Sequence, residues 1–270
     1  MADRSERKSR PTVRLEVLRT QQLTPHMIRV VAGGEGLAAF QPNEFTDAYV
    51  KVVFLEPGVT YPEPFDIGRV RAELPREQWP RMRTYTVRAY DGDELTLDFV
   101  THGDEGLAGP WARAAEPGDE LLLTGPGGAY APREDVDWHL LVGDEAALPA
   151  IAVSLESMPA GALAHVFVEV ADSGEEQPLD TKADARVRWV QRSAGEDLVA
   201  AVRSLEFPAG TVQAFVHGEA GFVRELRRYL LGERGVRRDL LSISGYWRRG
   251  KNDEEWRVEK AAEKAAEPAG

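Results

Sequence analysis

The chain is 270 residues long and carries 33 lysine or arginine residues against 45 aspartate or glutamate residues, a formal net charge of −12. This balance argues against a nucleic-acid-binding protein, because phosphate contacts need clustered basic side chains. The absence of cysteine excludes disulfides, Cys-ligated zinc, protein-held iron–sulfur clusters and thiolate nucleophiles, so any electron carrier is an organic cofactor or a metal with other ligands.

The first 11 residues are polar and mixed in charge. They lack the apolar stretch of a secretory signal, and we interpret them as a disordered leader. No apolar run approaches the roughly 20 residues that a membrane-spanning helix needs. We therefore predict a cytoplasmic protein that does not insert into a membrane. The hydrophobic content of 43% is enough to give each of two domains a core.

Strand-like patterns fill residues 12–133. Apolar and polar residues alternate over 13–17 and 95–99, and shorter β-rich runs occupy 49–54, 85–89 and 121–123. Six or seven short strands with Gly/Asp turns predict an antiparallel β-barrel. Residues 56–80 hold five prolines and no clear period, so we expect a long ordered loop or an insertion there.

Residues 134–245 show a different hydrophobic pattern. Apolar segments at 140–142, 165–170, 187–190, 212–216 and 240–243 alternate with helical patterns such as 222–231. This alternation predicts an α/β domain with a parallel sheet. We treat residues 246–270 as a separate tail. Asn252 followed by Glu255 resembles a capping box, and Asp253 with Arg257 is a favourable pair, so a helix is expected to start there.

Two motifs suggest a ligand with a pyrophosphate and a flat ring. Arg83-Thr84-Tyr85-Thr86 begins a predicted strand, and side chains two apart on a strand share a face, so Arg83 and Tyr85 should point the same way. An exposed arginine beside a half-buried tyrosine is an equal alternative for the spacing alone. Residues 102–111 form a Gly-rich run before a short predicted helix, which suits either a phosphate cradle or a plain turn.

These motifs, with Gly143-Asp144-Glu145, residues 147–151 and residues 245–250, together resemble the siderophore-interacting proteins. That family contains FAD-dependent ferric-siderophore reductases related to ferredoxin–NADP reductases. The likeness runs in order from about residue 12 to residue 250. It departs at Ala146, where the family usually has threonine, and at Gly127, where a basic residue is frequent.

The resemblance implies that Arg83 pairs with the FAD pyrophosphate, Tyr85 packs on the isoalloxazine, and Thr86 lies near the reactive edge of that ring. Thr84 belongs to the same motif. Further implied cofactor contacts are Asp98, Phe99, Val100 and His102 along the ribityl and phosphate portion, the backbone amides of Gly106, Leu107 and Ala108 with Trp111 in the same turn, Asp144, Glu145 and Ala147 from the α/β domain, and Tyr246 and Trp247 from the C-terminal strand.

The implied activity is the cytoplasmic reduction of Fe(III) in a siderophore. A nicotinamide donates two electrons whereas Fe(III) accepts one, so a flavin is the natural converter, and no catalytic acid–base residue is required. Many ferric siderophores are anionic, so a basic patch is needed on this acidic protein. Its candidates are Lys51, Arg248, Arg249 and Lys251, each of which could equally be a solvated surface charge.

The electron donor is predicted to be NADH or NADPH. Family members differ here, and some use ferredoxin. Asp172, Glu175 and Glu176, after the second α/β strand, would disfavour a 2′-phosphate and therefore favour NADH. The five histidines lack metal-ligand spacing, so we predict no protein-bound metal. We expect a monomer.

Two alternatives remain open for the function. One keeps the flavin but changes the acceptor to a ferredoxin, a quinone or free flavin. The other is a non-catalytic siderophore-binding protein.

Overall fold

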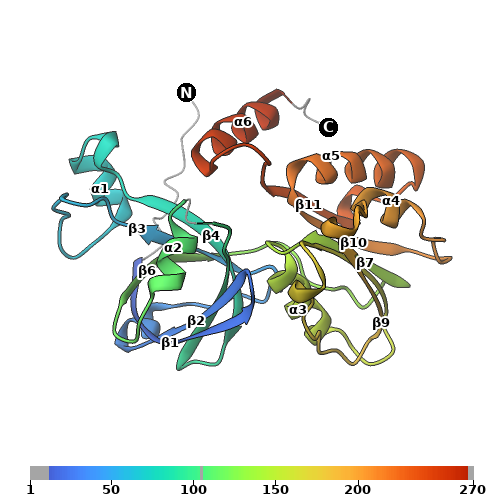
Figure 1. Ribbon diagram of the computed structural model, residues 1–270, viewed down its shortest axis with the longest axis horizontal. Coiled ribbons are helices and arrows are strands. Elements are labelled where there is room, and N and C mark those ends of the chain that lie inside the picture. The colour runs from blue at the N-terminus through green and yellow to red at the C-terminus, as the bar shows by residue number, and fades with distance from the viewer. Residues whose placement is uncertain (1–11, 104–105, 267–270) are drawn as a thin grey trace.

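The computed structural model describes residues 12–103 and 106–266, which form two units side by side with the C-terminal helix above them (Figure 1). The predicted leader, residues 1–11, lies outside the described residues, as do Asp104 and Glu105 of the Gly-rich run. None of the helices in the described ranges has the length and apolar character needed to cross a membrane.

The first unit is a closed antiparallel barrel, as predicted, with the strand order β1-β2-β5-β4-β3-β6. Its strands are β1 (Thr12–Thr24), β2 (Met27–Gly33), β3 (Tyr49–Phe54), β4 (Arg81–Tyr90), β5 (Glu94–Val100) and β6 (Glu120–Gly127). The alternating side chains of β1 explain the closure, because Val13, Leu15 and Val17 are about 1% exposed inside the barrel whereas their charged neighbours face solvent.

Short helices lie between the barrel strands. They are η1 (Glu35–Ala39), α1 (Ile67–Glu73), η2 (Arg76–Gln78) and α2 (Ala108–Ala114). The proline-rich insertion contains α1 and η2. Asp66 caps α1 by accepting a hydrogen bond from the Arg69 amide, and buried Val70 packs against Val53 and Leu122 of the barrel. A single short helix of this kind leaves no readable period in the sequence.

The second unit is a five-stranded parallel sheet with the order β11-β10-β7-β8-β9, again as predicted. Its elements are β7 (Trp138–Asp144), α3 (Leu148–Ser157), β8 (Leu163–Val170), η3 (Ser173–Glu175), β9 (Asp184–Gln191), η4 (Arg192–Ala194), α4 (Leu198–Arg203), β10 (Val212–Glu219), α5 (Ala220–Arg228), η5 (Tyr229–Glu233), η6 (Arg238–Leu240) and β11 (Leu241–Trp247). Every residue of the central strand β7 is buried, as expected for a parallel strand covered on both faces.

The two units share a continuous interface. Met27 of the barrel and Tyr130 of the connecting segment belong to one apolar cluster with α3 and β8. The Thr46 and Ser154 hydroxyls lie 2.8 Å apart across this contact, and Arg88 of β4 pairs with Glu156 of α3 at 2.5 Å. Because α3 packs directly on β4, the second unit lies against the strand that carries the Arg83 motif.

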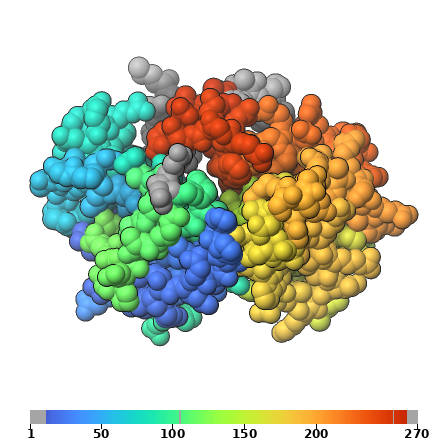
Figure 2. Space-filling view, viewed as in Figure 1, coloured from blue at the N-terminus to red at the C-terminus, as the bar shows by residue number. Residues whose placement is uncertain are grey.

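The tail forms helix α6 (Asp253–Ala266). The predicted capping box is confirmed, because the Glu255 amide donates to Asn252 Oδ1 at 2.9 Å and the Asn252 amide donates to Glu255 Oε2 at 3.1 Å. Strand β11 runs to Trp247, so Tyr246 and Trp247, which we had placed in the tail, belong to the sheet. In the space-filling view α6 lies over both halves of the molecule (Figure 2).

Candidate functional site

The Arg83 motif lies on β4 beside β3, and the pairing register decides where its side chains face. Arg83 and Tyr85 stand opposite Val52 and Val50, whose side chains point into the barrel. Cross-strand partners share a face of the sheet, so Arg83 and Tyr85 share one side, as predicted. Thr84 stands opposite Lys51 on the other side of the same strand pair.

Tyr85 has the environment of a stacking platform. Its ring lies 4.1 Å from the Phe99 ring, centroid to centroid, at 36°. Phe99 is fully buried, whereas Tyr85 is only half-buried at the edge of the barrel core. The Tyr85 ring is therefore supported by the core without being enclosed by it, which leaves room for a flat ligand ring.

The guanidinium of Arg83 binds the carboxylate of Glu254. Its Nη1 and Nη2 donate to the two carboxylate oxygens of Glu254 at 2.9 and 3.2 Å, and Nη1 also donates to the Met82 carbonyl at 3.1 Å. Glu254 comes from α6, far along the chain. The guanidinium is thus oriented for a two-point contact with an oxyanion, which is the geometry that a pyrophosphate requires.

The Gly-rich turn leads into α2. Gly106 adopts a left-handed backbone with φ of 85°, and Leu107 precedes the first helical residue, Ala108. The first amides of a helix have no intrahelical partner, so this turn can present donors to a phosphate. His102 is exposed beside it. Trp111 lies 5.4 Å from the Phe99 ring and helps to support the same core.

A cavity of 290 Å³ opens between β3 and α2. Phe54 and Trp111 form aromatic walls, and their ring centroids are 6.1 Å apart. Arg81, two residues before Arg83 on β4, also lines it. The cavity therefore includes one residue of the strand that carries the Arg83 motif.

Three predicted contacts on β5 have side chains that meet other parts of the protein. Asp98 accepts two hydrogen bonds from Arg29, at 2.7 and 2.8 Å, and is 5% exposed. The Phe99 side chain is in the barrel core, and Val100 packs at the interface between the units. Alternation along β5 directs Phe99 into the barrel and directs Asp98 and Val100 to the opposite face.

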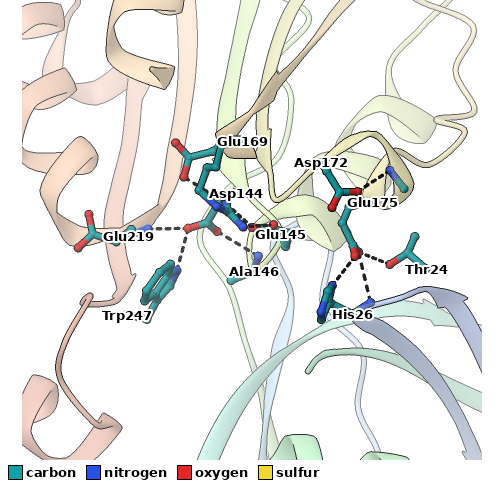
Figure 3. A network of polar contacts seen from close by, with 12 residues as sticks. Thr24, His26, Asp144, Glu145, Ala146, Glu169, Asp172, Glu175, Glu219 and Trp247 are labelled. Atoms are coloured by element: carbon teal, nitrogen blue, oxygen red, sulfur yellow. Dashed lines mark hydrogen bonds and ion pairs between the residues drawn. The ribbon is translucent and has the colours of Figure 1, made fainter. Parts of the chain in front are cut away.

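Asp144 ends β7 in a buried hydrogen-bond network (Figure 3). Its Oδ2 accepts from the Trp247 indole at 2.7 Å and from the Glu219 amide at 2.8 Å, and its Oδ1 accepts from the Ala146 amide at 3.0 Å. Burial raises the pKa of Asp144 to about 7, and the hydrogen bonds from Trp247 and the two amides limit the rise. Asp144 thus joins the carboxyl ends of three strands.

The side chains of Glu145 and Ala147, two further predicted flavin neighbours, pack within the second unit. Glu145 accepts from Arg192 at 2.5 and 3.0 Å, and Arg192 also donates to Glu169 at 3.2 Å. The hydrogen bonds that Arg192 donates to Glu145 raise the pKa of Arg192, while burial raises that of Glu169. Ala147 is 0% exposed. Within the second unit these residues fix the loop after β7.

Tyr246 and His217 lie beside the Asp144 network. Their ring centroids are 5.0 Å apart, and His217 stacks on Phe215 at 4.0 Å. Burial raises the pKa of Tyr246, with contributions from Asp47 and Asp144, and burial lowers that of His217 to about 3. The predicted closing residues, Tyr246 and Trp247, therefore stand at the sheet edge that faces the barrel.

The basic candidates are not equivalent. Lys51 is half-buried on the outer side of β3, opposite Thr84 and Thr124. The Arg248 guanidinium pairs with Glu259 at 3.4 Å and lies 5.9 Å from the centre of the Trp256 ring. Arg248 is therefore a contact of α6 rather than part of a solvated patch, whereas Arg249 and Lys251 are exposed.

Gly127, where relatives of the resembled family often carry a basic residue, has no room for a side chain. A Cβ there would lie 2.4 Å from Tyr49 Cζ.

The three carboxylates that favoured NADH do not form one patch. Glu175 is 2% exposed and bonds to the barrel, where Thr24 Oγ1 and His26 Nδ1 each lie 2.5 Å from its carboxylate (Figure 3). Glu176 accepts from Gln191 at 2.7 Å. Asp172 remains exposed and accepts from the Gly174 amide at 2.8 Å.

Sequence reasoning missed Glu254 and the contact that Glu175 makes with the barrel. Both are ordinary acidic residues in polar segments, and their partners are distant in the chain. No local pattern marks such a residue. The capping box predicted a helix around Glu254 but not the surface on which that helix lies.

Two family models match nearly the whole described chain. The siderophore-interacting FAD-binding domain matches residues 16–130, and the siderophore-interacting protein model matches residues 136–250. Each therefore coincides with one of the two structural units.

Relatives match over most of their length. The chain is 43% identical to the uncharacterized protein Rv2895c of Mycobacterium tuberculosis, over 95% of this chain and 98% of that protein. It is 34% identical to the ferric vibriobactin reductase ViuB of Vibrio cholerae, over 91% and 93%. The NADPH-dependent ferric-chelate reductase of Escherichia coli is 32% identical over 79% and 84%.

Solved structures agree. The siderophore-interacting protein SipS from Aeromonas hydrophila superposes with a TM-score of 0.80 and 31% identity, covering 96% of this chain and 99% of that chain. The ferredoxin reductase of carbazole 1,9a-dioxygenase, 18% identical, has a TM-score of 0.63 and covers 88% of this chain and 70% of its own. This second likeness shows that the fold is that of a ferredoxin reductase.

Proposed function

This chain belongs to the siderophore-interacting protein family, and we propose that it is an FAD-dependent reductase of ferric siderophores that draws its electrons from NAD(P)H. The proposal rests on the observation that the side chains of Arg83 and Tyr85 lie on the same side of β4. One side chain is oriented for a bidentate oxyanion, and the other is a supported aromatic platform.

The residues present fit FAD. Arg83 would hold the pyrophosphate, the amides at the start of α2 would assist it, and Tyr85 would carry the isoalloxazine. The buried Thr86 hydroxyl lies next on the same strand. We assign the 290 Å³ cavity walled by Phe54 and Trp111 to the adenine, because aromatic walls suit a purine.

Bound FAD would supply the chemistry that converts two-electron donation by a nicotinamide into one-electron reduction of iron. The chain binds and orients the partners in this reaction. Trp247, held by Asp144, and Tyr246, packed beside His217, would border the site from the second unit. Reduction of Fe(III) to Fe(II) weakens its hold on hard oxygen ligands, so the siderophore releases the metal without an acid–base residue from the protein.

For the substrate, we propose that Lys51, Arg249 and Lys251 attract an anionic ferric siderophore. The net charge of −12 makes a local positive field necessary. Lys51 shares its side of the strand pair with Thr84, within the motif that we assign to FAD. Arg248 is omitted because α6 engages its guanidinium.

For the donor, we propose a nicotinamide nucleotide, in line with the NADPH dependence named for the Escherichia coli relative. The preference for NADH now depends on Asp172 alone, since Glu175 and Glu176 bond within the protein. NAD(P)H is a cytoplasmic reductant, and on that ground we propose that the protein is cytoplasmic.

The proposal is tested first by cofactor retention. Arg83→Ala should lose most of its FAD on gel filtration, because the pyrophosphate loses its bidentate partner. The matched control is Arg19→Ala. Arg19 also makes a two-point contact with a carboxylate, that of Glu94 at 2.6 Å, but on β1. Equal retention by wild type and Arg83→Ala would refute the assigned contact.

The activity is tested by mixing the flavin-loaded protein anaerobically with NADH or NADPH and a ferric hydroxamate, in the presence of an Fe(II) chelator. Formation of the Fe(II) chelate supports the proposal. Wild-type protein that takes up no FAD excludes any flavoenzyme function. Flavin reduction without Fe(II) would show that the acceptor is another compound.

A further inference from the structure

Helix α6 connects the two units. On the second unit, Lys260 Nζ donates to Ser244 Oγ at 2.9 Å and to the Gly245 carbonyl at 2.7 Å, and the 4% exposed Trp256 packs on Gly245. On the barrel, Arg257 donates to the Met82 carbonyl. The helix therefore lies across the junction between β11 and β4 (Figures 1 and 2).

The first turn of α6 places the carboxylate of Glu254 beside Arg83 on β4. Glu254 binds Arg83 at 2.9 and 3.2 Å through both terminal nitrogens. The Glu254 side chain is 51% exposed, whereas that of Arg83 is only 16% exposed. Partial burial opposes ionisation of Glu254, but the hydrogen bond and charge of Arg83, with the charge of Arg257, lower its pKa overall. Glu254 is therefore ionised at neutral pH.

This contact conflicts with the role assigned to Arg83. A pyrophosphate bound to Arg83 in bidentate fashion needs the same Nη1 and Nη2 donors that Glu254 occupies. A carboxylate that stayed in place would also repel the phosphate charges within a few ångströms. Both anions cannot use this edge of the guanidinium together.

We propose that Glu254 is a placeholder for the cofactor pyrophosphate. It holds Arg83 in position in the FAD-free protein, and FAD binding displaces it together with the first turn of α6. Trp256 and Lys260 keep the rest of the helix on the second unit. The first turn of α6 therefore covers the cofactor site until FAD displaces it. This inference rests on the proposed function, because it concerns the affinity of the same site for FAD.

The test compares FAD binding by FAD-free wild type, Glu254→Gln and Glu255→Gln. Quenching of flavin fluorescence gives the dissociation constant in a titration and the association rate in stopped flow. Glu254→Gln should bind about fivefold more tightly and associate faster, because a partly exposed ion pair of about 1 kcal/mol no longer competes. Glu255→Gln removes the same charge one residue away and keeps the capping box, since glutamine also accepts from the Asn252 amide.

A second comparison isolates the contact. In an Arg83→Gln background, which should bind FAD more weakly, Glu254→Gln should give no further gain in affinity. A gain of the same size in both backgrounds would overturn the proposal, and so would equal gains from Glu254→Gln and Glu255→Gln, which would report net charge. Unchanged or weaker binding by Glu254→Gln would overturn it while leaving the proposed function intact. Failure of the wild type to quench FAD fluorescence would overturn both.

Discussion

Asp144 offers a quantitative test of the second unit, through the variant Asp144→Asn. Its carboxylate is 0% exposed and connects β7 to Trp247 and Glu219. Burial raises its pKa from 3.8 to about 7. Asparagine has nearly the same shape but does not titrate, so it removes the pH dependence that the buried acid contributes.

The sign follows from proton linkage. Below about pH 4, Asp144 is protonated in the folded and the unfolded chain. Between about pH 4 and pH 7 the folded state keeps the proton and the unfolded state has lost it, so folding stability falls as pH rises, by about 1.36 kcal/mol per pH unit. Over the difference between 3.8 and about 7, the total is about 4 kcal/mol.

The assay is urea unfolding of wild type and Asp144→Asn at intervals from pH 4.5 to 8, followed by circular dichroism. Other titrating groups are common to both proteins, so the difference between the two curves isolates Asp144. Relative to wild type, the variant should gain about 3 to 4 kcal/mol across this range. Asp172→Asn, which removes an exposed carboxylate from the same unit, is the control. Parallel curves for wild type and Asp144→Asn would refute the reasoning.

Three further predictions concern packing. Glu175→Gln should lower the free energy of unfolding by about 1–3 kcal/mol, because Thr24 and His26 lose a buried charged acceptor, and a loss below about 0.5 kcal/mol in urea unfolding would contradict this. Gly218→Ala should cost at least 1–3 kcal/mol in thermal unfolding, since φ is 137° and the new Cβ would lie 2.6 Å from the buried carboxylate; an unchanged melting temperature would disprove it. Trp256→Ala should speed hydrogen exchange of the α6 amides more than that of the sheet, and equal protection of α6 in both proteins would show that the indole does not anchor the helix.

Glu254 and Glu175 add two polar connections between the units to the apolar interface and the Thr46–Ser154 and Arg88–Glu156 contacts. Glu254 reaches Arg83 on the α6 side, and Glu175 reaches Thr24 and His26 at the turn between β1 and β2. One of these contacts lies on a residue assigned to FAD and the other does not. Cofactor binding should therefore alter the first contact while the second holds the units together.

Much of the fold was predictable because it depends on local periodicity. Alternation over residues 13–17 predicts a strand with one buried face, and apolar segments separated by helical patterns predict the parallel sheet. The capping box at Asn252 was readable because both of its partners lie within one helical turn. Helix α1 was not, since its single buried residue, Val70, sets no period.

By itself the sequence determined the two architectures, the side that Arg83 and Tyr85 share on β4, and the lack of any thiol ligand, because each depends on residue type or on neighbours within a few positions. Only the tertiary structure decided which groups these side chains meet. Arg83 pairs with a carboxylate 171 residues away, and Asp144 is fixed by an indole 103 residues away. Such contacts leave no local pattern, since they arise when separately formed elements pack together. In this protein they direct the carboxylate of Asp144, which was expected beside the cofactor, toward hydrogen-bond donors of the protein itself.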